Sequence, residues 1–292
     1  MQECSFVLNI IDKRILRLAL NSVLMDKYNM VRVTDLNHII NEQSYDLLNI
    51  DFAVECKKDL DQRGVLTLPN FLNAKTLIEL VAEAEDCASQ AYYTDSTHNV
   101  YLTKIDTNYA SDHVINKQLV SSKGCICTDQ IPSGSKLEQL YSSSLFKKFI
   151  AKVVGEPSLF PYEDPLSSIN VHYAGEGQEL NWHFDNSEFA ITLLLQSPVG
   201  GGEFQYIKDF RNSEENEMNF DGVQKLLTAS VSPDILTMEP GTLVLFRGRN
   251  SIHRVTPTIG DRKRILVVLA YNSEPGIALS ESARKTFYGR LC

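Results

Sequence analysis

The sequence has few of the features that mark a secreted or redox-active protein. Six cysteines are scattered over 292 residues. The only close pair, Cys125 and Cys127, is separated by one residue, whereas zinc knuckles and redox motifs usually have a spacer of two. We therefore interpret the cysteines as reduced thiols that bind no structural zinc.

Long hydrophobic runs are also missing. The apolar run Phe6–Ile11 ends at three charged residues, so it is too short for the apolar region of a signal peptide. These charges follow the run, whereas the positive charges of a signal peptide precede it. No other stretch approaches the length that a membrane span requires. These absences predict a cytoplasmic protein with no membrane partner.

Positive charge is scarce. The chain has 28 Lys and Arg against 37 Asp and Glu, which gives a net charge of −9, and its densest basic stretch lies inside an apolar strand pattern at residues 262–264. Proteins that bind a phosphate backbone need a positively charged surface, so we expect no nucleic acid partner. The apolar fraction of 43% is typical of globular domains, and we expect a small-molecule substrate.

Glycine and proline are absent from the first 63 residues. Apolar residues recur there at three- and four-residue steps, which predicts an N-terminal helical extension over residues 1–60. A short strand over residues 64–69 and a helix capped by Asn73 follow, at the start of a single domain over residues 61–292.

Residues 89–143 show little periodicity and are rich in Ser, Thr, Asn, Asp and Tyr. A segment of this length without a clear pattern is often a lid or a binding loop. It can equally be a surface insertion without a role in the site, and the sequence leaves both interpretations open.

The second half of the chain contains many short apolar runs separated by Gly-rich or Pro-Gly turns, which predict strands and one inserted helix at residues 219–229. This number of short strands favours a jelly roll, a double-stranded β-helix. The predicted fold class is mostly β with flanking N-terminal helices, with the jelly-roll core at about residues 165–277. The strand candidates lie at residues 168–173, 189–196, 202–207, 242–246 and 264–271.

Three residues in this core predict a metal site. His183 and Asp185 are two positions apart, so on a strand their side chains project from the same face. His253 follows a later strand and supplies a second imidazole. Two imidazoles and one carboxylate form the facial triad of non-haem Fe(II) oxygenases, which leaves three open positions on the metal. These positions suit the keto acid end of 2-oxoglutarate and O2.

The distal carboxylate of 2-oxoglutarate needs a cation, and the planar guanidinium of Arg forms a bidentate pair with a carboxylate. Arg262 and Arg264 are two residues apart on the strand after His253. We favour Arg264, which lies deeper in the apolar run, but Arg262 remains a candidate. Asn170 is a further candidate for contact with the cosubstrate.

Three segments resemble the core of the Fe(II)/2-oxoglutarate dioxygenase superfamily: residues 182–196, 201–206 and 245–257. More narrowly, they are similar to the branch of free-amino-acid hydroxylases and lysine-type radical halogenases. The resemblance implies iron held by His183, Asp185 and His253, with 2-oxoglutarate held by an Arg on the following strand. Halogenases of this branch have a small residue in place of the carboxylate, which makes room for chloride. Because Asp185 is present, we expect a hydroxylase.

The substrate side is less defined by the sequence. Asn186, Arg249 and Asn272 are polar residues among apolar neighbours and are candidates for substrate contact, although each can also be a turn or capping residue. The amide of Asn186 cannot form an ion pair, which argues against lysine as the substrate. We expect hydroxylation of a free amino acid or a derivative; a protein or peptide hydroxylase and a catalytically silent 2-oxoglutarate-binding jelly roll are the alternatives.

Overall fold

The computed structural model describes residues 36–292, so most of the predicted extension over residues 1–60 lies outside the described residues. Its described end passes through short turns into helix α2 (Ile50–Arg63), where the N-cap Asn49 accepts two backbone N–H hydrogen bonds. The helix ends at Gly64, whose positive φ of 72° carries no steric cost for glycine. The predicted start of the domain at residue 61 stays a prediction.

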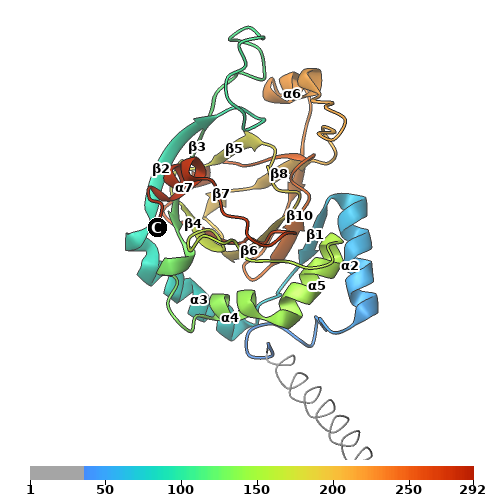
Figure 1. Cartoon of the computed structure of the whole chain (residues 1–292). Helices are drawn as coiled ribbons and strands as arrows, with labels where there is room; N and C mark the ends of the chain where they lie inside the picture. Colours follow the sequence, from blue (N-terminus) through green and yellow to red (C-terminus); the bar gives the residue numbers. More distant parts are fainter. Residues whose placement is uncertain (1–35) are drawn as a thin grey trace, which may run out of the picture.

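Two facing antiparallel sheets form the core of the protein (Figure 1). The larger sheet has the strand order β1-β10-β6-β13-β4-β3-β2 within the described part of the chain. Its strands are β1 (Val65–Leu68), β2 (Tyr92–His98), β3 (Leu119–Ile126), β4 (Ile169–Ala174), β6 (Ala190–Gln196), β10 (Leu243–Phe246) and β13 (Arg264–Leu269).

The smaller sheet has the order β5-β11-β8-β9 and carries most of the metal site described below. Its strands are β5 (Leu180–His183), β8 (Phe204–Ile207), β9 (Asp234–Leu236) and β11 (Ile252–Val255). A third, two-stranded sheet pairs β7 (Gly200–Gly201) with β12 (Thr258–Ile259). Two sheets that face each other in this way form the predicted jelly roll.

Alternating side chains give the larger sheet two different faces. On β13, Ile265 and Val267 belong to the main hydrophobic cluster, which they share with residues of the helices. Arg264 and Leu266 point the opposite way and line a cavity between the sheets. The period of two along each strand therefore separates the packed core from the site.

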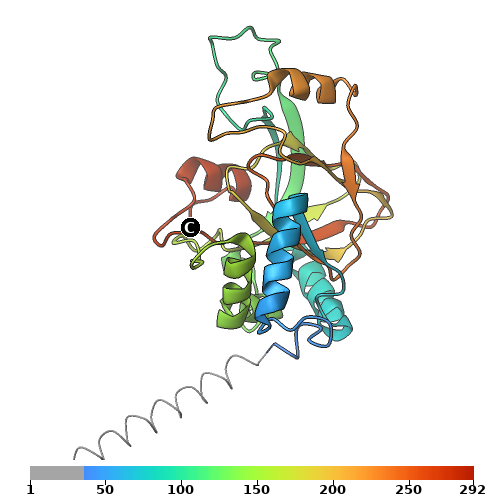
Figure 2. The same ribbon diagram turned by 90° about the vertical axis from the view of Figure 1, so that its right-hand side faces the viewer.

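Four helices lie together against one side of the barrel, and the views of Figures 1 and 2 agree on this arrangement. They bury their apolar faces in the main hydrophobic cluster, which includes Phe71 and, from the helices themselves, Phe146 and Phe149. These helices are α2, α3 (Ala74–Cys87), α4 (Lys136–Ser142) and α5 (Ser144–Val154), with 3₁₀ turns η1 (Ala88–Gln90) and η2 (Thr128–Gln130) nearby. None of the helices in residues 36–292 is long and apolar enough to cross a membrane.

Two further helices lie away from this layer. Helix α6 (Phe220–Leu227) stands at the far end of the barrel beside the loop 99–118 (Figure 2). The rings of Tyr109 and Phe220 lie 5.5 Å apart and connect the loop to the helix. Helix α7 (Glu281–Tyr288) packs on β2 and β3 and closes one side of the barrel.

The predicted strands and the inserted helix at residues 219–229 are confirmed to within a few residues. The segment 89–143 is more ordered than its composition suggested, because it supplies β2 and β3 of the larger sheet as well as the loop between them. Polar residues run consecutively along parts of both strands, and those that line the cavity include Thr94, Ser96, His98, Ser121 and Lys123.

Candidate metal centre and ligand cavity

The two predicted histidine ligands face each other across the smaller sheet. His183 ends β5 and His253 lies on β11, and the two residues are direct partners in the antiparallel pairing. Their rings are 4.2 Å apart, centroid to centroid. Both side chains are buried, with exposures of 6% and 5%. The sheet register therefore brings together two residues that are far apart in the chain.

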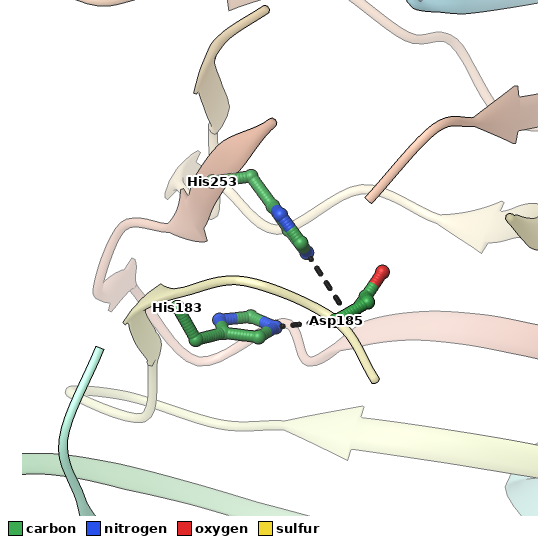
Figure 3. Close-up of side chains that lie close together, drawn as sticks. All are labelled: His183, Asp185 and His253. Atoms are coloured by element: carbon green, nitrogen blue, oxygen red, sulfur yellow. Dashed lines mark ion pairs between the residues drawn. The ribbon is translucent and has the colours of Figure 1, made fainter. Parts of the chain in front are cut away.

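Asp185 lies two residues beyond His183, where the chain leaves β5. Its Oδ1 atom is 3.5 Å from the Nε2 atom of His183 and 3.5 Å from the Nε2 atom of His253 (Figure 3). One ligand atom of each of the three residues lies within 4.8 Å of the others. All three side chains thus point toward a common position.

Hydrogen bonds fix the two imidazoles in the orientation that a metal requires. Nδ1 of His183 lies 2.8 Å from the carbonyl oxygen of Asn181, and Nδ1 of His253 lies 3.0 Å from that of Ser251. Because a carbonyl oxygen only accepts, each Nδ1 carries the proton and donates it. The lone pairs of both Nε2 atoms are then free and face Asp185. Ligands in metal sites are commonly held by such outer hydrogen bonds.

Gly248 makes room for the carboxylate. The backbone N–H of Asp185 donates to the carbonyl oxygen of Gly248 at 3.1 Å, which draws the two segments together. A Cβ atom on residue 248 would overlap Oδ2 of Asp185. Glycine is therefore required here by close approach rather than by an unusual φ angle.

The charges of the site keep Asp185 ionised. Burial alone would raise the pKa of its carboxyl group, but the neighbouring imidazoles of His253 and His183 hold the pKa well below the usual range. Burial and the nearby His253 lower the pKa of His183, so its ring stays neutral. An ionised carboxylate beside a neutral imidazole is the protonation state that metal ligands require.

This donor set fits a ferrous ion. Two nitrogen donors and one carboxylate oxygen on one side of a metal leave positions open for other ligands. Within the described residues, these three form the one group of at least three His, Cys, Asp or Glu side chains close enough to share an ion.

A cavity of about 940 Å³ opens from the metal position into the barrel. Phe204 and Phe246 pack against the ring of His253, with centroid distances of 5.5 Å and 4.8 Å. Most of the polar groups lie on the opposite wall, which the larger sheet forms. The cavity therefore has the candidate metal ligands on one side and most of its polar groups on the other.

Arg264 is a buried cationic residue on that wall. It is only 6% exposed, and burial lowers the pKa of its guanidinium to about 10. In the part of the chain that the structure describes, it forms no hydrogen bond or ion pair. A buried guanidinium without an internal partner is suited to bind a carboxylate ligand.

Arg262 lies elsewhere. It precedes β13, is exposed, and donates to the carbonyl oxygen of Pro198 at 3.1 Å. It does not line the cavity. The strand starts at Arg264, so the inward alternation that the sequence suggested for both arginines applies to Arg264 alone.

Asn170, predicted as a cosubstrate contact, is buried and is not among the residues that line the cavity. Its amide nitrogen donates to the carbonyl oxygens of Leu166 and Ile169, and its Oδ1 accepts from the hydroxyl of Tyr288 at 2.8 Å. Both ends of the amide are thus engaged. The side chain ties β4 to α7 in this structure.

The three predicted substrate contacts do not line the cavity either. Asn186 is exposed next to the metal ligand, and its carbonyl oxygen accepts from Arg249 at 3.3 Å. The guanidinium of Arg249 lies 4.0 Å from a carboxylate oxygen of Glu214. The amide nitrogen of Asn272 is buried and has no hydrogen-bond partner. Their roles in substrate binding stay predictions.

Sequence reasoning missed four polar residues that line the cavity: His98, Ser121, Lys123 and His172. His98 lies on β2 and its Nε2 atom is 2.6 Å from the hydroxyl of Ser121 on β3. Residues 94–98 are all polar, so the sequence pattern did not show which of these side chains face the cavity.

Comparison with known proteins agrees with this geometry. The model of a protein family described as Halogenase D matches residues 49–287. No curated protein matches the chain.

Among solved structures, the chain is similar to the carbocyclase SnoK from nogalamycin biosynthesis, a non-haem α-ketoglutarate-dependent enzyme. The TM-score is 0.53 at 12% identity, over 79% of this chain and 89% of that one. It is also similar to the α-ketoglutarate-dependent epimerase SnoN from the same biosynthesis. That match has a TM-score of 0.51 at 12% identity, over 77% of this chain and 83% of that one. At these identities the likeness shows the fold.

Proposed function

Because the chain belongs to the halogenase D family, we propose that it is an oxygenase that depends on Fe(II) and 2-oxoglutarate and uses O2 to hydroxylate an aliphatic C–H group of a small molecule. A free amino acid or a derivative is the proposed substrate. The observation that carries the proposal is the convergence of His183, Asp185 and His253 on one position. Arg264 supports it, as an unpaired buried guanidinium in the same cavity.

When bound, Fe(II) and 2-oxoglutarate supply the oxidising chemistry, with O2 as the oxidant and succinate and CO2 as co-products. His183, Asp185 and His253 hold the ion. Arg264 binds the distal carboxylate of 2-oxoglutarate and so fixes the orientation of the cosubstrate along the cavity.

The surrounding residues position these groups and keep water away. The carbonyl oxygens of Asn181 and Ser251 hold the imidazoles in one tautomer and one orientation. Phe204 and Phe246 form an apolar wall beside His253, which limits access of water to the metal.

Asp185 favours hydroxylation over halogenation within this family. Its carboxylate occupies the space between the imidazoles and Gly248, where a small residue would leave room for a halide. With the carboxylate as the third ligand, chloride has no position next to the metal on that side. The size of the cavity, about 940 Å³, supports a small molecule as the substrate.

The test is succinate formation from 2-oxoglutarate with Fe(II), ascorbate and O2, stimulated by a panel of free amino acids and related metabolites. We expect at least one compound to raise the rate in the wild-type protein and to gain one oxygen atom by mass spectrometry. Asp185→Ala is the inactive control. Binding of Fe(II) and 2-oxoglutarate without any succinate would instead support a silent binding protein. A response to peptides alone would support a peptide hydroxylase.

A further inference from the structure

A second cation lies in the cavity, on the same wall as Arg264. Lys123 is on β3, and its Nζ atom is 3.2 Å from both ring nitrogens of His172 on β4. It also lies 5.9 Å from the ring centroid of Phe287, on the helix that closes this side of the barrel. All three side chains line the cavity. The ammonium group therefore sits where β3, β4 and α7 meet.

The sheet register shows that the two cations project in the same direction. Gly124 pairs with Tyr173, and Arg264 pairs with Ala174. Tyr173 points outward into the helical layer, where its hydroxyl donates to the carbonyl oxygen of Ala84. Side chains alternate along each strand, so Lys123 and Ala174, which adjoin the outward pair of Gly124 and Tyr173, face the opposite way. Arg264 pairs with Ala174 and shares its direction, so Lys123 and Arg264 both point into the barrel.

Lys123 has no carboxylate partner among the described residues. It forms no ion pair there, and its polar neighbour His172 is a ring that stays neutral, since burial and the nearby Lys123 lower the pKa of His172. Burial also lowers the pKa of Lys123, although Cys125 and Asp185 act in the opposite direction. Asp185 would be a ligand of the metal in the proposed function. An ammonium group kept inside a protein without a counter-ion is costly, and an anionic ligand removes that cost.

The charges of the cosubstrate are already matched. One carboxylate of 2-oxoglutarate belongs to the metal and the other to Arg264, which leaves Lys123 without a partner. We propose that Lys123 and His172 form a second carboxylate-binding site, which recognises a carboxylate of the substrate. This inference rests on the proposed function and narrows it: the substrate is a carboxylic acid, such as an amino acid with a free carboxyl group, rather than an amide, an ester or an internal peptide residue.

His172 completes the site. A neutral imidazole has one N–H donor and one acceptor nitrogen. Lys123 Nζ lies 3.2 Å from both ring nitrogens, and the thiol of Cys125 is a further hydrogen-bond partner of the ring, so His172 fixes the position of the ammonium group. The lysine supplies the positive charge and the histidine orients it. The ring of Phe287 covers both side chains from the α7 side.

The thiol of Cys125 is the competing internal partner. It lies on the same strand face as Lys123, and its pKa is lowered well below the ordinary value, first by Cys127 and also by His172 and Lys123. If this thiolate were the counter-ion, Lys123 would serve the fold rather than a ligand. Loss of the lysine charge would then reduce stability without affecting binding.

The experiment compares Lys123→Met with the wild-type protein and with Lys104→Met. Lys104 also lines the cavity but is exposed, so it controls for loss of a lysine near the site. The probes are the common L-amino acids and their α-carboxamides. Their binding is measured by the change they cause in the visible absorption of the anaerobic Fe(II)–2-oxoglutarate complex, and 2-oxoglutarate affinity is measured in the same samples.

We expect a free acid to bind the wild type and its carboxamide to bind at least tenfold more weakly. Lys123→Met should weaken binding of the acid roughly tenfold to a hundredfold, as for loss of a charge-assisted hydrogen bond. Lys104→Met should leave it unchanged, and Lys123→Arg should restore most of it. Unchanged metal and 2-oxoglutarate binding shows that the Lys123→Met variant is folded.

Four results would overturn the site: equal binding of acid and carboxamide, unchanged binding of the acid by Lys123→Met, a loss of 2-oxoglutarate affinity as large as that of the acid, or binding of no acid by a wild-type protein that binds metal and 2-oxoglutarate. The third result would assign the lysine to the cosubstrate. A wild-type protein that binds neither metal nor 2-oxoglutarate would overturn the proposed function itself, and the inference with it.

Discussion

Gly248 and Asp185 approach so closely that a single methyl group on residue 248 would occupy the position of the Asp185 carboxylate. The site therefore depends on a residue that supplies no ligand atom. The histidine ligands are held by strand pairing, but the carboxylate is held by the turn after β10, which brings Gly248 against it.

We predict that Gly248→Ala weakens metal binding by at least tenfold, because the added Cβ pushes the carboxylate away from the imidazoles. The measurement is a titration with Mn(II) or Fe(II) under nitrogen. Gly175→Ala is the matched control, since a Cβ there meets only the side chain of Gln178 at 3.6 Å. Wild-type affinity in Gly248→Ala would show that the carboxylate does not hold the metal.

We expect Arg264→Leu to raise the KM for 2-oxoglutarate roughly tenfold to a hundredfold, since a buried charge-assisted pair with the distal carboxylate is lost. Arg262→Leu is the control on the same segment, because its guanidinium is exposed and contacts only the carbonyl oxygen of Pro198. A larger effect at Arg262 than at Arg264 would reverse the assignment.

Product analysis in excess chloride tests the role of Asp185. Because its carboxylate fills the space beside Gly248, the wild-type protein should give a product with one added oxygen and no chlorine. Mass spectrometry separates the two, as chlorine leaves its isotope pattern. A chlorinated product from the wild type would contradict the assignment of Asp185 as the third ligand.

The stability of the metal-free protein should fall as the pH drops below 6.5. Burial lowers the pKa values of His98, His172 and His183 from the ordinary value of 6.5. The unfolded chain takes up protons near pH 6.5, while the folded protein keeps these rings neutral to lower pH, so acid favours unfolding in that window. Melting temperatures at about pH 7.5 and about pH 5.5 measure the effect. His172→Gln should reduce it, and equal melting temperatures would contradict it.

Removal of the Tyr288 hydroxyl should loosen helix α7. The group donates to Oδ1 of Asn170 at 2.8 Å, and both residues are buried. Tyr288→Phe leaves this acceptor unsatisfied, at a cost of about 1–3 kcal/mol in the free energy of unfolding. Urea denaturation measures the change. Tyr92→Phe, at an exposed ring, should change it by less than about 0.5 kcal/mol.

Much of the fold could be predicted because strand alternation and turn residues are local signals. The strand over residues 264–271 and the helix after Asn73 needed only neighbouring residues. The metal ligands could be proposed because His183 and Asp185 share a strand face and His253 follows a recognisable strand. The prediction for His183 and Asp185 depends on a short distance along the chain, whereas the prediction for His253 depends on the strand that precedes it.

The polar wall could not be predicted in this way. Lys123, His172 and Phe287 come together only because β3, β4 and α7 are neighbours in space, and no local pattern encodes that order. Asn170 illustrates the same limit: it is a polar residue in an apolar strand pattern, and the sequence does not show that its amide oxygen accepts a hydrogen bond from Tyr288 on α7. Burial of a polar group alone does not distinguish a ligand contact from a structural bond.

In the proposed function the metal ligands and Arg264 bind opposite ends of the cosubstrate from the two sheets, so the distance between the sheets selects the length of the dicarboxylate. The distance between the two sheets depends on the apolar side chains that line the cavity, such as Val244 and Leu266. Dicarboxylates with one methylene more or fewer would reach one anchor and miss the other. Selectivity for chain length is thus a property of the packing between the sheets, and substitutions there should change it without touching any ligand.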